Sequence, residues 1–191
     1  MVKEPRPGKV KTRLGNDIGM VNAAWWYRHQ SLSILRSVIH PKWNTVIAVT
    51  PDIDGRRSRV WPREFKRISQ GMSDLGERML KILDSFRFGP ICIIGSDIPD
   101  VNSKNIERAF KLLMNKDFVL GPTLDGGFWL FGARKTRKIS RKTFKKVRWS
   151  SIHAYDDTIK TLGTDRWASC DVLSDVDNGS DYMNAQKRMI F

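Results

Sequence analysis

The stretch P-I-C-I-I-G-S-D-I-P-D at residues 90–100 decides the fold of this chain. Its apolar run, Ile91–Ile94, is short, rich in β-branched residues and closed by a glycine, which predicts a buried strand. Asp97 follows that strand, and ligands of open α/β sheets bind beyond the carboxyl ends of the strands. Asp97 is therefore well placed to hold a divalent cation against a phosphate. Asp97 and Asp100 would serve equally well as turn and N-cap residues of the next helix, and this stretch alone leaves both interpretations open.

Length and composition suit one globular domain that spans residues 1–191. No apolar run approaches the ~20 residues that a membrane span needs. The only two cysteines, Cys92 and Cys170, indicate neither a disulfide framework nor a zinc site, which fits a reducing cytoplasm. The net charge of +14 predicts affinity for phosphates, on nucleotides, nucleic acid or membrane surfaces, without choosing among them.

The amino terminus leads almost directly into a basic loop, Lys3–Leu14, that contains proline and glycine. A doubly wound sheet needs a strand before such a loop, so we expect Met1–Lys3 to be the end of a truncated first strand. We also expect the true start to lie a few codons upstream. A basic loop with a glycine can bind a triphosphate through backbone N–H groups and Lys or Arg side chains. Basic amino-terminal arms are common, however, so the loop alone is a weak signal.

Hydrophobic periodicity predicts one long helix over residues 21–39, since the following residues recur at helical spacing: Val21, Ala24 or Trp25, Arg28, Leu32, Leu35 and Ile39. The basic stretch at residues 54–68 indicates an irregular loop that crosses the sheet. A glycine in the first turn of the next helix, Gly76, indicates that something approaches its backbone closely. Further strands are expected at 45–50, 117–120 and 167–173, and further helices from about residues 74, 102, 151 and 181.

Two glycines follow Asp125, and this Asp-Gly-Gly is either a simple hairpin turn or a loop of a binding site. Asp175 and Asp177 form a second acidic cluster just past a predicted strand. The segment Arg134–Arg148 carries nine basic residues in fifteen. Such a run is ordinarily a solvated face or a flexible loop, and a nucleic-acid contact is the less favoured alternative.

Six segments, taken in order along the chain, resemble a bacterial family of glycosyltransferase-A-type proteins of undefined activity. They are K-E-P-R-P-G-K-V-K-T-R-L at Lys3–Leu14, Q-G-M-S-D-L-G-E-R-M at Gln70–Met79, I-G-S-D-I-P-D at Ile94–Asp100, G-P-T-L-D-G-G-F-W-L at Gly121–Leu130, W-S-S at Trp149–Ser151 and D-V-D-N-G-S-D at Asp175–Asp181. More distantly, the family is similar to guanylyltransferases that act on phospho-lactate-like acids and on the molybdenum cofactor.

The resemblance implies an α/β, Rossmann-like nucleotide-diphospho-sugar transferase fold of the glycosyltransferase-A type, with a mostly parallel sheet flanked by helices. It implies that Gly8, Lys11 and Arg13 contact the nucleotide phosphates. The segment Gln70–Arg78, with Gln70, Gly71 and Asp74 as candidate contacts, falls where such folds meet the nucleobase and ribose.

The resemblance also implies a metal site and an acceptor site. Asp97 takes the metal-binding position, and Asp177 and Asp175 complete the metal site. The loop formed by Asp125, Gly126 and Gly127 faces the acceptor.

Together these features predict an enzyme, a transferase that uses an activated nucleotide with Mg²⁺ or Mn²⁺, and in which Lys11, Arg13 and Asp97 are catalytic. The donor is a nucleoside triphosphate or a nucleotide sugar. Nucleotidyl transfer to a small phosphorylated or acidic acceptor is favoured, because Ser-Asp-Ile-Pro-Asp resembles such enzymes more than the Asp-x-Asp of glycosyltransferases. Glycosyl transfer from a nucleotide-diphospho-sugar is the close alternative. A third hypothesis, a non-catalytic basic nucleic-acid-binding protein, explains the net charge but not the acidic residues at three strand ends.

Overall fold

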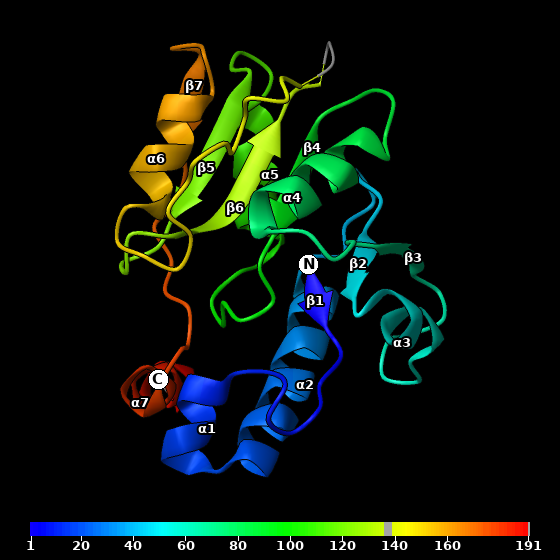
Figure 1. The fold of residues 1–191 in the computed structure, drawn as a ribbon, viewed down its shortest axis with the longest axis vertical. Helices are drawn as coiled ribbons and strands as arrows, with labels where there is room; N and C mark the ends of the chain where they lie inside the picture. Colours follow the sequence, from blue (N-terminus) through cyan, green and yellow to red (C-terminus); the bar gives the residue numbers. More distant parts are fainter. Residues whose placement is uncertain (136–138, 191) are drawn as a thin grey trace.

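A computed structural model describes residues 1–135 and 139–190 and shows two β-sheets flanked by helices (Figure 1). The parallel three-stranded sheet has the order β1-β2-β3, with β1 at Val2–Lys3, β2 at Val46–Thr50 and β3 at Lys66–Ser69. The four-stranded sheet has the order β4-β6-β5-β7, with β4 at Ile91–Ile94, β5 at Phe118–Pro122, β6 at Phe128–Ala133 and β7 at Trp167–Ser169. Strand β6 is antiparallel to β4 and β5, whereas β5 and β7 are parallel.

The two sheets adjoin at β1 and β4. There the Met1 ammonium donates a hydrogen bond of 2.6 Å to the carbonyl of Ile94. The predicted α/β fold, with a mostly parallel sheet flanked by helices, is confirmed. The helices are α1 at Thr12–Ile18, α2 at Met20–Ser37, α3 at Asp52–Arg57, α4 at Leu75–Asp84, α5 at Ser103–Leu112, α6 at Ala154–Thr161 and α7 at Gly179–Ile190. Among the described residues, no helix has the length and apolar composition that a membrane span requires.

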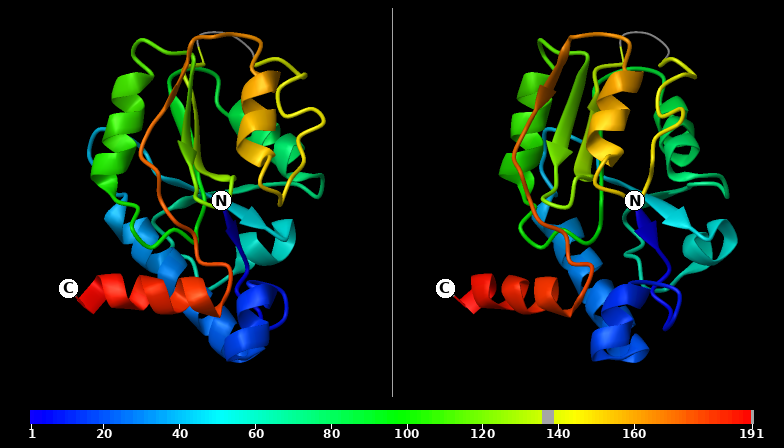
Figure 2. Two further views of the ribbon diagram at one scale, coloured as in Figure 1. Left: turned by 90° about the vertical axis from the view of Figure 1, so that its left-hand side faces the viewer. Right: turned by 60° about the vertical axis from the view of Figure 1, so that its left-hand side comes forward.

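Helices cover both faces of the four-stranded sheet (Figure 2). Side chains alternate along β6, so Phe131 packs with α4 and α6 on one face, whereas Leu130 packs with α2 and α5 on the other. Each face therefore has its own apolar core. The loops at one end of this sheet remain available for a site.

The structure corrects part of the predicted apolar face of the long helix. Ala24 and Leu35 are buried as predicted, but Val21, Trp25 and Ile39 are exposed. Helix α2 also buries Ala23 and Tyr27, which lie outside the predicted set. The face of α2 that carries Tyr27 is buried because this side chain makes a polar contact, which apolar periodicity does not detect. The buried Tyr27 hydroxyl lies 2.8 Å from Ser96 Oγ, next to Asp97.

The stretch at residues 54–68 is also more regular than predicted, since it contains most of α3 and the start of β3. Strand β3 (K-R-I-S) lies at the edge of its sheet and is partly exposed, so it lacks the apolar run that identifies a buried strand. Gly76 behaves as predicted, because a Cβ there would lie 2.6 Å from Cβ of Phe144. Residues 136–138 of the basic segment Arg134–Arg148 lie outside the described residues.

Candidate active site

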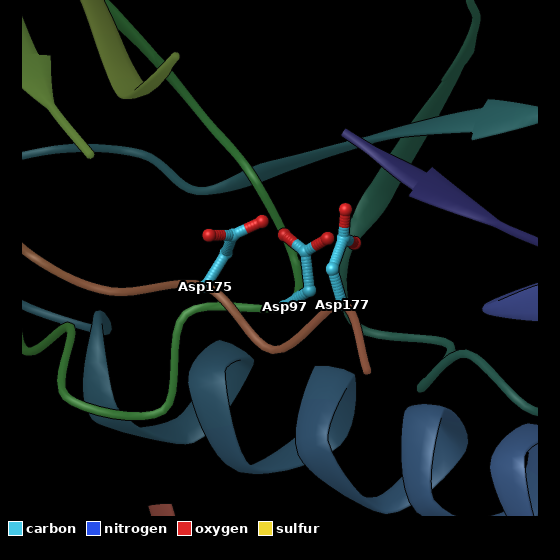
Figure 3. Close-up of side chains that lie close together, drawn as sticks. All are labelled: Asp97, Asp175 and Asp177. Atoms are coloured by element: carbon cyan, nitrogen blue, oxygen red, sulfur yellow. The ribbon is translucent and has the colours of Figure 1, made fainter. Parts of the chain in front are cut away.

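Three aspartates from two separate loops come together at the end of β4. Asp97 follows β4, and Asp175 and Asp177 come from the segment that links β7 to α7. Each offers a carboxylate oxygen, and these oxygens lie within 4.8 Å of one another. Figure 3 shows the three side chains pointing to the same side, away from the helices beneath them.

The position of Val176 explains why both neighbouring aspartates reach the site. Its side chain is fully buried against Leu14 and Ala23, and its N–H donates to the carbonyl of Asp97 at 3.2 Å. In extended backbone, alternate side chains point to opposite sides. Burying Val176 therefore turns Asp175 and Asp177 toward Asp97.

Lys11 neutralises part of this acidic cluster from the start of α1. Its backbone is left-handed, with φ of 44°, and its side chain is only 9% exposed. The Nζ atom lies 2.5 Å from Asp97 Oδ2 and 2.7 Å from Asp177 Oδ1. Burial alone would lower the pKa of Lys11, but the carboxylates of Asp97 and Asp177 raise it above its ordinary value, so the lysine is charged. Arg13 adds an ion pair of 3.1 Å to Asp177.

Asp175 and Asp177 differ in their electrostatic environments. Burial would raise the pKa of Asp177, but Lys11 and Arg13 outweigh burial and lower it. The pKa of Asp175 is raised to about 6, first by burial and then by the carboxylates of Asp125, Asp97 and Asp177, against a smaller opposing effect of Lys11. Among the described residues, no cation pairs with Asp175 within salt-bridge distance. An all-carboxylate cluster with one uncompensated member suits a hard divalent cation such as Mg²⁺ or Mn²⁺.

The cluster lines an open cleft of about 700 Å³. The predicted site residues on its wall are Lys11, Arg13, Asp97, Asp125, Gly127, Asp175 and Asp177. The cleft therefore unites residues from both ends of the chain. Its volume is in the range of small-molecule sites in proteins, which hold ligands in cavities of roughly 300–1,000 Å³.

The Asp-Gly-Gly loop forms the hairpin between β5 and β6, and Asp125 and Gly127 also line the cleft. Its role as the loop of a binding site stays a prediction. Asp125 Oδ1 accepts hydrogen bonds from Thr123 Oγ1 at 2.5 Å and from the N–H of Gly127 at 3.0 Å. Gly126 has φ of +84°, and a Cβ there would lie 2.2 Å from the carbonyl oxygen of Ile152. Glycine is thus required for the turn and for the close approach of the chain before α6.

Besides Gly126, four other predicted contacts are not on the wall of this cleft: Gly8, Gln70, Gly71 and Asp74. The buried Gln70 amide donates to the carbonyls of Val2 at 2.9 Å and Ala48 at 2.7 Å, and so ties β1 to β2. Gly71 N–H donates to Asp52 Oδ1 at 3.0 Å, and Asp74 caps α4 by accepting from the N–H of Glu77 at 2.9 Å. Their contact with a nucleotide stays a prediction.

Sequence reasoning missed Tyr27, which lines the cleft. Its hydroxyl lies 2.8 Å from Ser96 Oγ and accepts a 2.9 Å hydrogen bond from the N–H of Lys3. Tyr27 thus joins α2, β1 and the loop that carries Asp97. No local signal could have found this role, because it depends on contacts between segments far apart in the sequence.

This α/β fold matches that of a protein crystallised under the provisional name of a nucleotide-diphospho-sugar transferase. Residues 34–151 match the family described as "Uncharacterized protein conserved in bacteria (DUF2064)", and the chain belongs to this family. The chain is similar to a crystal structure from Desulfovibrio desulfuricans G20, of a protein provisionally named a nucleotide-diphospho-sugar transferase. The two are 30% identical with a TM-score of 0.85, over 98% of this chain and 84% of that one.

More distant structures share the fold. Rv0371c from Mycobacterium tuberculosis H37Rv, crystallised in complex with manganese, is 16% identical with a TM-score of 0.51, over 84% of this chain and 85% of that one. Its homologue from Mycobacterium sp. strain JC1 is 13% identical with a TM-score of 0.56, over 86% of this chain and 83% of that one. The comparison with curated proteins gives no match. The predicted resemblance to a glycosyltransferase-A-type family of undefined activity is confirmed.

Proposed function

We propose that this chain is a single-domain, divalent-metal-dependent transferase that uses an activated nucleotide, with nucleotidyl transfer to a small phosphorylated or acidic acceptor as its reaction. The observation that carries the proposal is the group of three carboxylates within 4.8 Å of one another. They share one cleft with Lys11 and Arg13. Carboxylates that gather without a cation for each of them repel one another, and a divalent metal ion removes that cost.

Asp97, Asp175 and Asp177 would hold Mg²⁺ or Mn²⁺, and the fit rests on their oxygen ligands and on the uncompensated charge of Asp175. The bound ion would neutralise negative charge on phosphate oxygens. Lys11 and Arg13 would donate hydrogen bonds to the phosphate oxygens that the ion leaves free. The manganese complex of Rv0371c, a protein of the same fold, lends support to the binding of a divalent metal.

Glycosyl transfer from a nucleotide-diphospho-sugar is the second candidate, and one observation favours it. Asp175 and Asp177 have the Asp-x-Asp spacing associated with glycosyltransferases, and both lie in the acidic cluster. The name given to the Desulfovibrio protein points in the same direction. In either case the partners are a nucleotide donor and a small acceptor. A cytoplasmic location is part of the proposal, supported by the free thiols of Cys92 and Cys170.

The compound that is released from the donor distinguishes the two reactions. The protein is incubated with Mn²⁺, a panel of candidate acceptors and either nucleoside triphosphates or nucleotide sugars. Acceptor-dependent release of pyrophosphate indicates nucleotidyl transfer, whereas release of a nucleoside diphosphate from a nucleotide sugar indicates glycosyl transfer.

Binding provides the test of the metal assignment. We expect Asp97→Asn to abolish Mn²⁺-dependent binding of the donor, measured by calorimetry. The matched control is Asp100→Asn in the same loop, where the carboxylate pairs with Arg188 at 3.3 Å and does not line the cleft. Donor binding by Asp97→Asn with unchanged Mn²⁺ dependence would show that Asp97 is not a ligand.

A further inference from the structure

Two exposed apolar side chains lie at the same cleft as the charged cluster. Leu75 is 42% exposed and Ile152 is 72% exposed, and both line the cleft. Leu124, next to the cleft residue Asp125, is 80% exposed. Single exposed apolar residues are normal, but apolar side chains that line the same concave site as polar groups are typical of a small-molecule site.

Trp149 holds these separate loops together. Its ring packs against the first turn of α4, where a Cβ on Gly76 would lie 3.0 Å from Cζ2 of the tryptophan. It also meets Phe128 edge-to-face, with ring centroids 6.2 Å apart. Phe128 and Trp149 both line the cleft and pack against the core beneath it. Phe128 and Trp149 therefore form an apolar wall of the cleft that the core supports.

Ile152 is fixed in this wall by backbone contacts. The N–H of Tyr155 donates to the carbonyl of Gly126 at 2.9 Å, which joins the turn before α6 to the β5–β6 hairpin. The absence of a side chain at Gly126 lets that hairpin approach the backbone of Ile152. The exposed position of the Ile152 side chain is thus set by its neighbours. The turn before α6 and the first turn of α4 meet at the end of the sheet that carries the site (Figures 1 and 2).

The cleft therefore has two chemically distinct parts. One part is the charged cluster around Lys11 and Asp97, and the other is the apolar wall of Leu75, Phe128, Trp149 and Ile152. A ligand that contacts only phosphate-binding groups would leave this wall in water. Apolar surface removed from water stabilises a complex in proportion to its area.

We propose that the acceptor is an amphiphile, whose phosphate or acid group faces the charged cluster and whose hydrocarbon portion lies on the apolar wall. This inference rests on the proposed transferase function and names the substrate class of the same site. The wall is the part of the cleft that selects this acceptor over a purely polar one, such as a free sugar phosphate.

Alkyl phosphates of graded length test the proposal. Inorganic phosphate and butyl, hexyl and octyl phosphate are titrated into the full chain with Mn²⁺ below their micellar concentrations, and the dissociation constants are measured by calorimetry. Since full burial of one CH₂ is worth about fourfold in affinity, a half-open wall should give about two- to threefold per added methylene. An affinity that does not depend on chain length would overturn the proposal.

Two variants and two controls test whether the alkyl chain of the ligand contacts the apolar wall of the cleft. Leu75→Ser and Ile152→Ser change exposed side chains, so folding should be retained, and each should flatten the dependence on chain length. Val21→Ser and Phe88→Ser change residues that are 68% and 84% exposed and do not line the cleft, so they should leave it unchanged. A steep dependence that survives in both cleft variants would place the alkyl contact elsewhere and overturn the proposal.

Donor binding, measured in the same variants, separates failure of the inference from failure of the proposed function. If the unmodified protein shows no Mn²⁺-dependent binding of any nucleotide or nucleotide sugar, the transferase function itself fails. If donor binding is intact but alkyl length has no effect, only the amphiphilic acceptor is wrong. If the cleft variants weaken nucleotide binding alone, the apolar wall contacts the nucleobase, which also overturns the proposal.

Discussion

Lys11 and the basic segment Arg134–Arg148 are both cationic, but they use charge in opposite ways. The Lys11 side chain is 9% exposed and lies between two carboxylates that come from distant parts of the chain. Arg141 and Arg148, in contrast, have side chains that are 69% and 57% exposed. Exposed ion pairs contribute little to stability, whereas a buried charge is costly unless the side chains around it supply a partner. The number of basic residues is therefore a poor guide to the location of the site.

Apolar side chains, rather than charges, hold the basic segment in place. Ile139, Phe144 and Val147 are buried and belong to the core that α4 and α6 share with the sheet. The described part of the segment is thus not simply a solvated face, although its lysines at 142, 145 and 146 are exposed. Its charged residues project from a loop that the core anchors.

The largest expected effect tests this anchoring. Phe144 is 5% exposed, and its ring lies 4.7 Å from that of Phe131 and 6.0 Å from that of Trp149, centroid to centroid. Phe144→Ala should lower the free energy of unfolding by about 3–5 kcal/mol, because it leaves a cavity in the core. Urea denaturation measures the loss. The control is the exposed neighbour in Lys145→Ala, which should change stability by less than about 0.5 kcal/mol. Equal effects of the two substitutions would mean that the segment is a loose loop.

The next effect concerns the buried cation. Lys11→Met leaves the carboxylates of Asp97 and Asp177 close together without their common partner, which should cost about 3 kcal/mol of stability. Mn²⁺ should then raise the melting temperature of the variant more than that of the unmodified protein, since it binds only the folded cluster. Lys9→Met, an exposed lysine on the same loop, is the matched control. A variant that Mn²⁺ does not stabilise would contradict a metal site at these aspartates.

These two regions also show what the sequence could predict. The strand at residues 91–94 and the acidic residues beyond strand ends are local patterns, and the geometry of sheets brings such residues to one edge. The ion pair of Lys11 with Asp177 joins positions 166 residues apart, so no local pattern contains it. The role of Tyr27 likewise depends on its contact with Ser96 across 69 residues. Strand β3 escaped prediction because an edge strand needs no apolar run.

The third effect arises from Asp175, whose pKa is raised to about 6 from its ordinary value of 3.8, first by burial and then by neighbouring carboxylates. The folded state therefore holds this proton more tightly than the unfolded state, and stability falls as pH rises from about 4 to 6. Asp175→Asn removes the charge, so it should stabilise the metal-free protein at pH 8 by about 1 kcal/mol, a value reduced for solvent screening. The gain should vanish near pH 4.

Urea denaturation in the presence of a chelator, at pH 8 and at pH 4, measures this difference. Asp165→Asn, at an exposed position, should show no gain at either pH. The same Asp175→Asn variant should bind Mn²⁺ more weakly, so stability and metal affinity should change in opposite directions. A variant that is less stable at pH 8 would contradict the electrostatic account of Asp175.

The smallest expected effect comes from the exposed lysines of the basic segment. Lys142, Lys145 and Lys146 do not line the cleft, so replacing all three by Gln should change stability by less than about 0.5 kcal/mol and leave Mn²⁺-dependent donor binding intact. Retention on single-stranded DNA over a range of salt concentrations tests the alternative of a nucleic-acid-binding protein. If each lysine neutralises one phosphate, each substitution should lower the salt slope by about 0.7, and the triple variant by about 2. A lower slope with intact donor binding would make the segment an accessory surface, separate from the cleft. Weaker donor binding by the triple variant would instead make these lysines part of the site, and the contrast with Lys11 would fail.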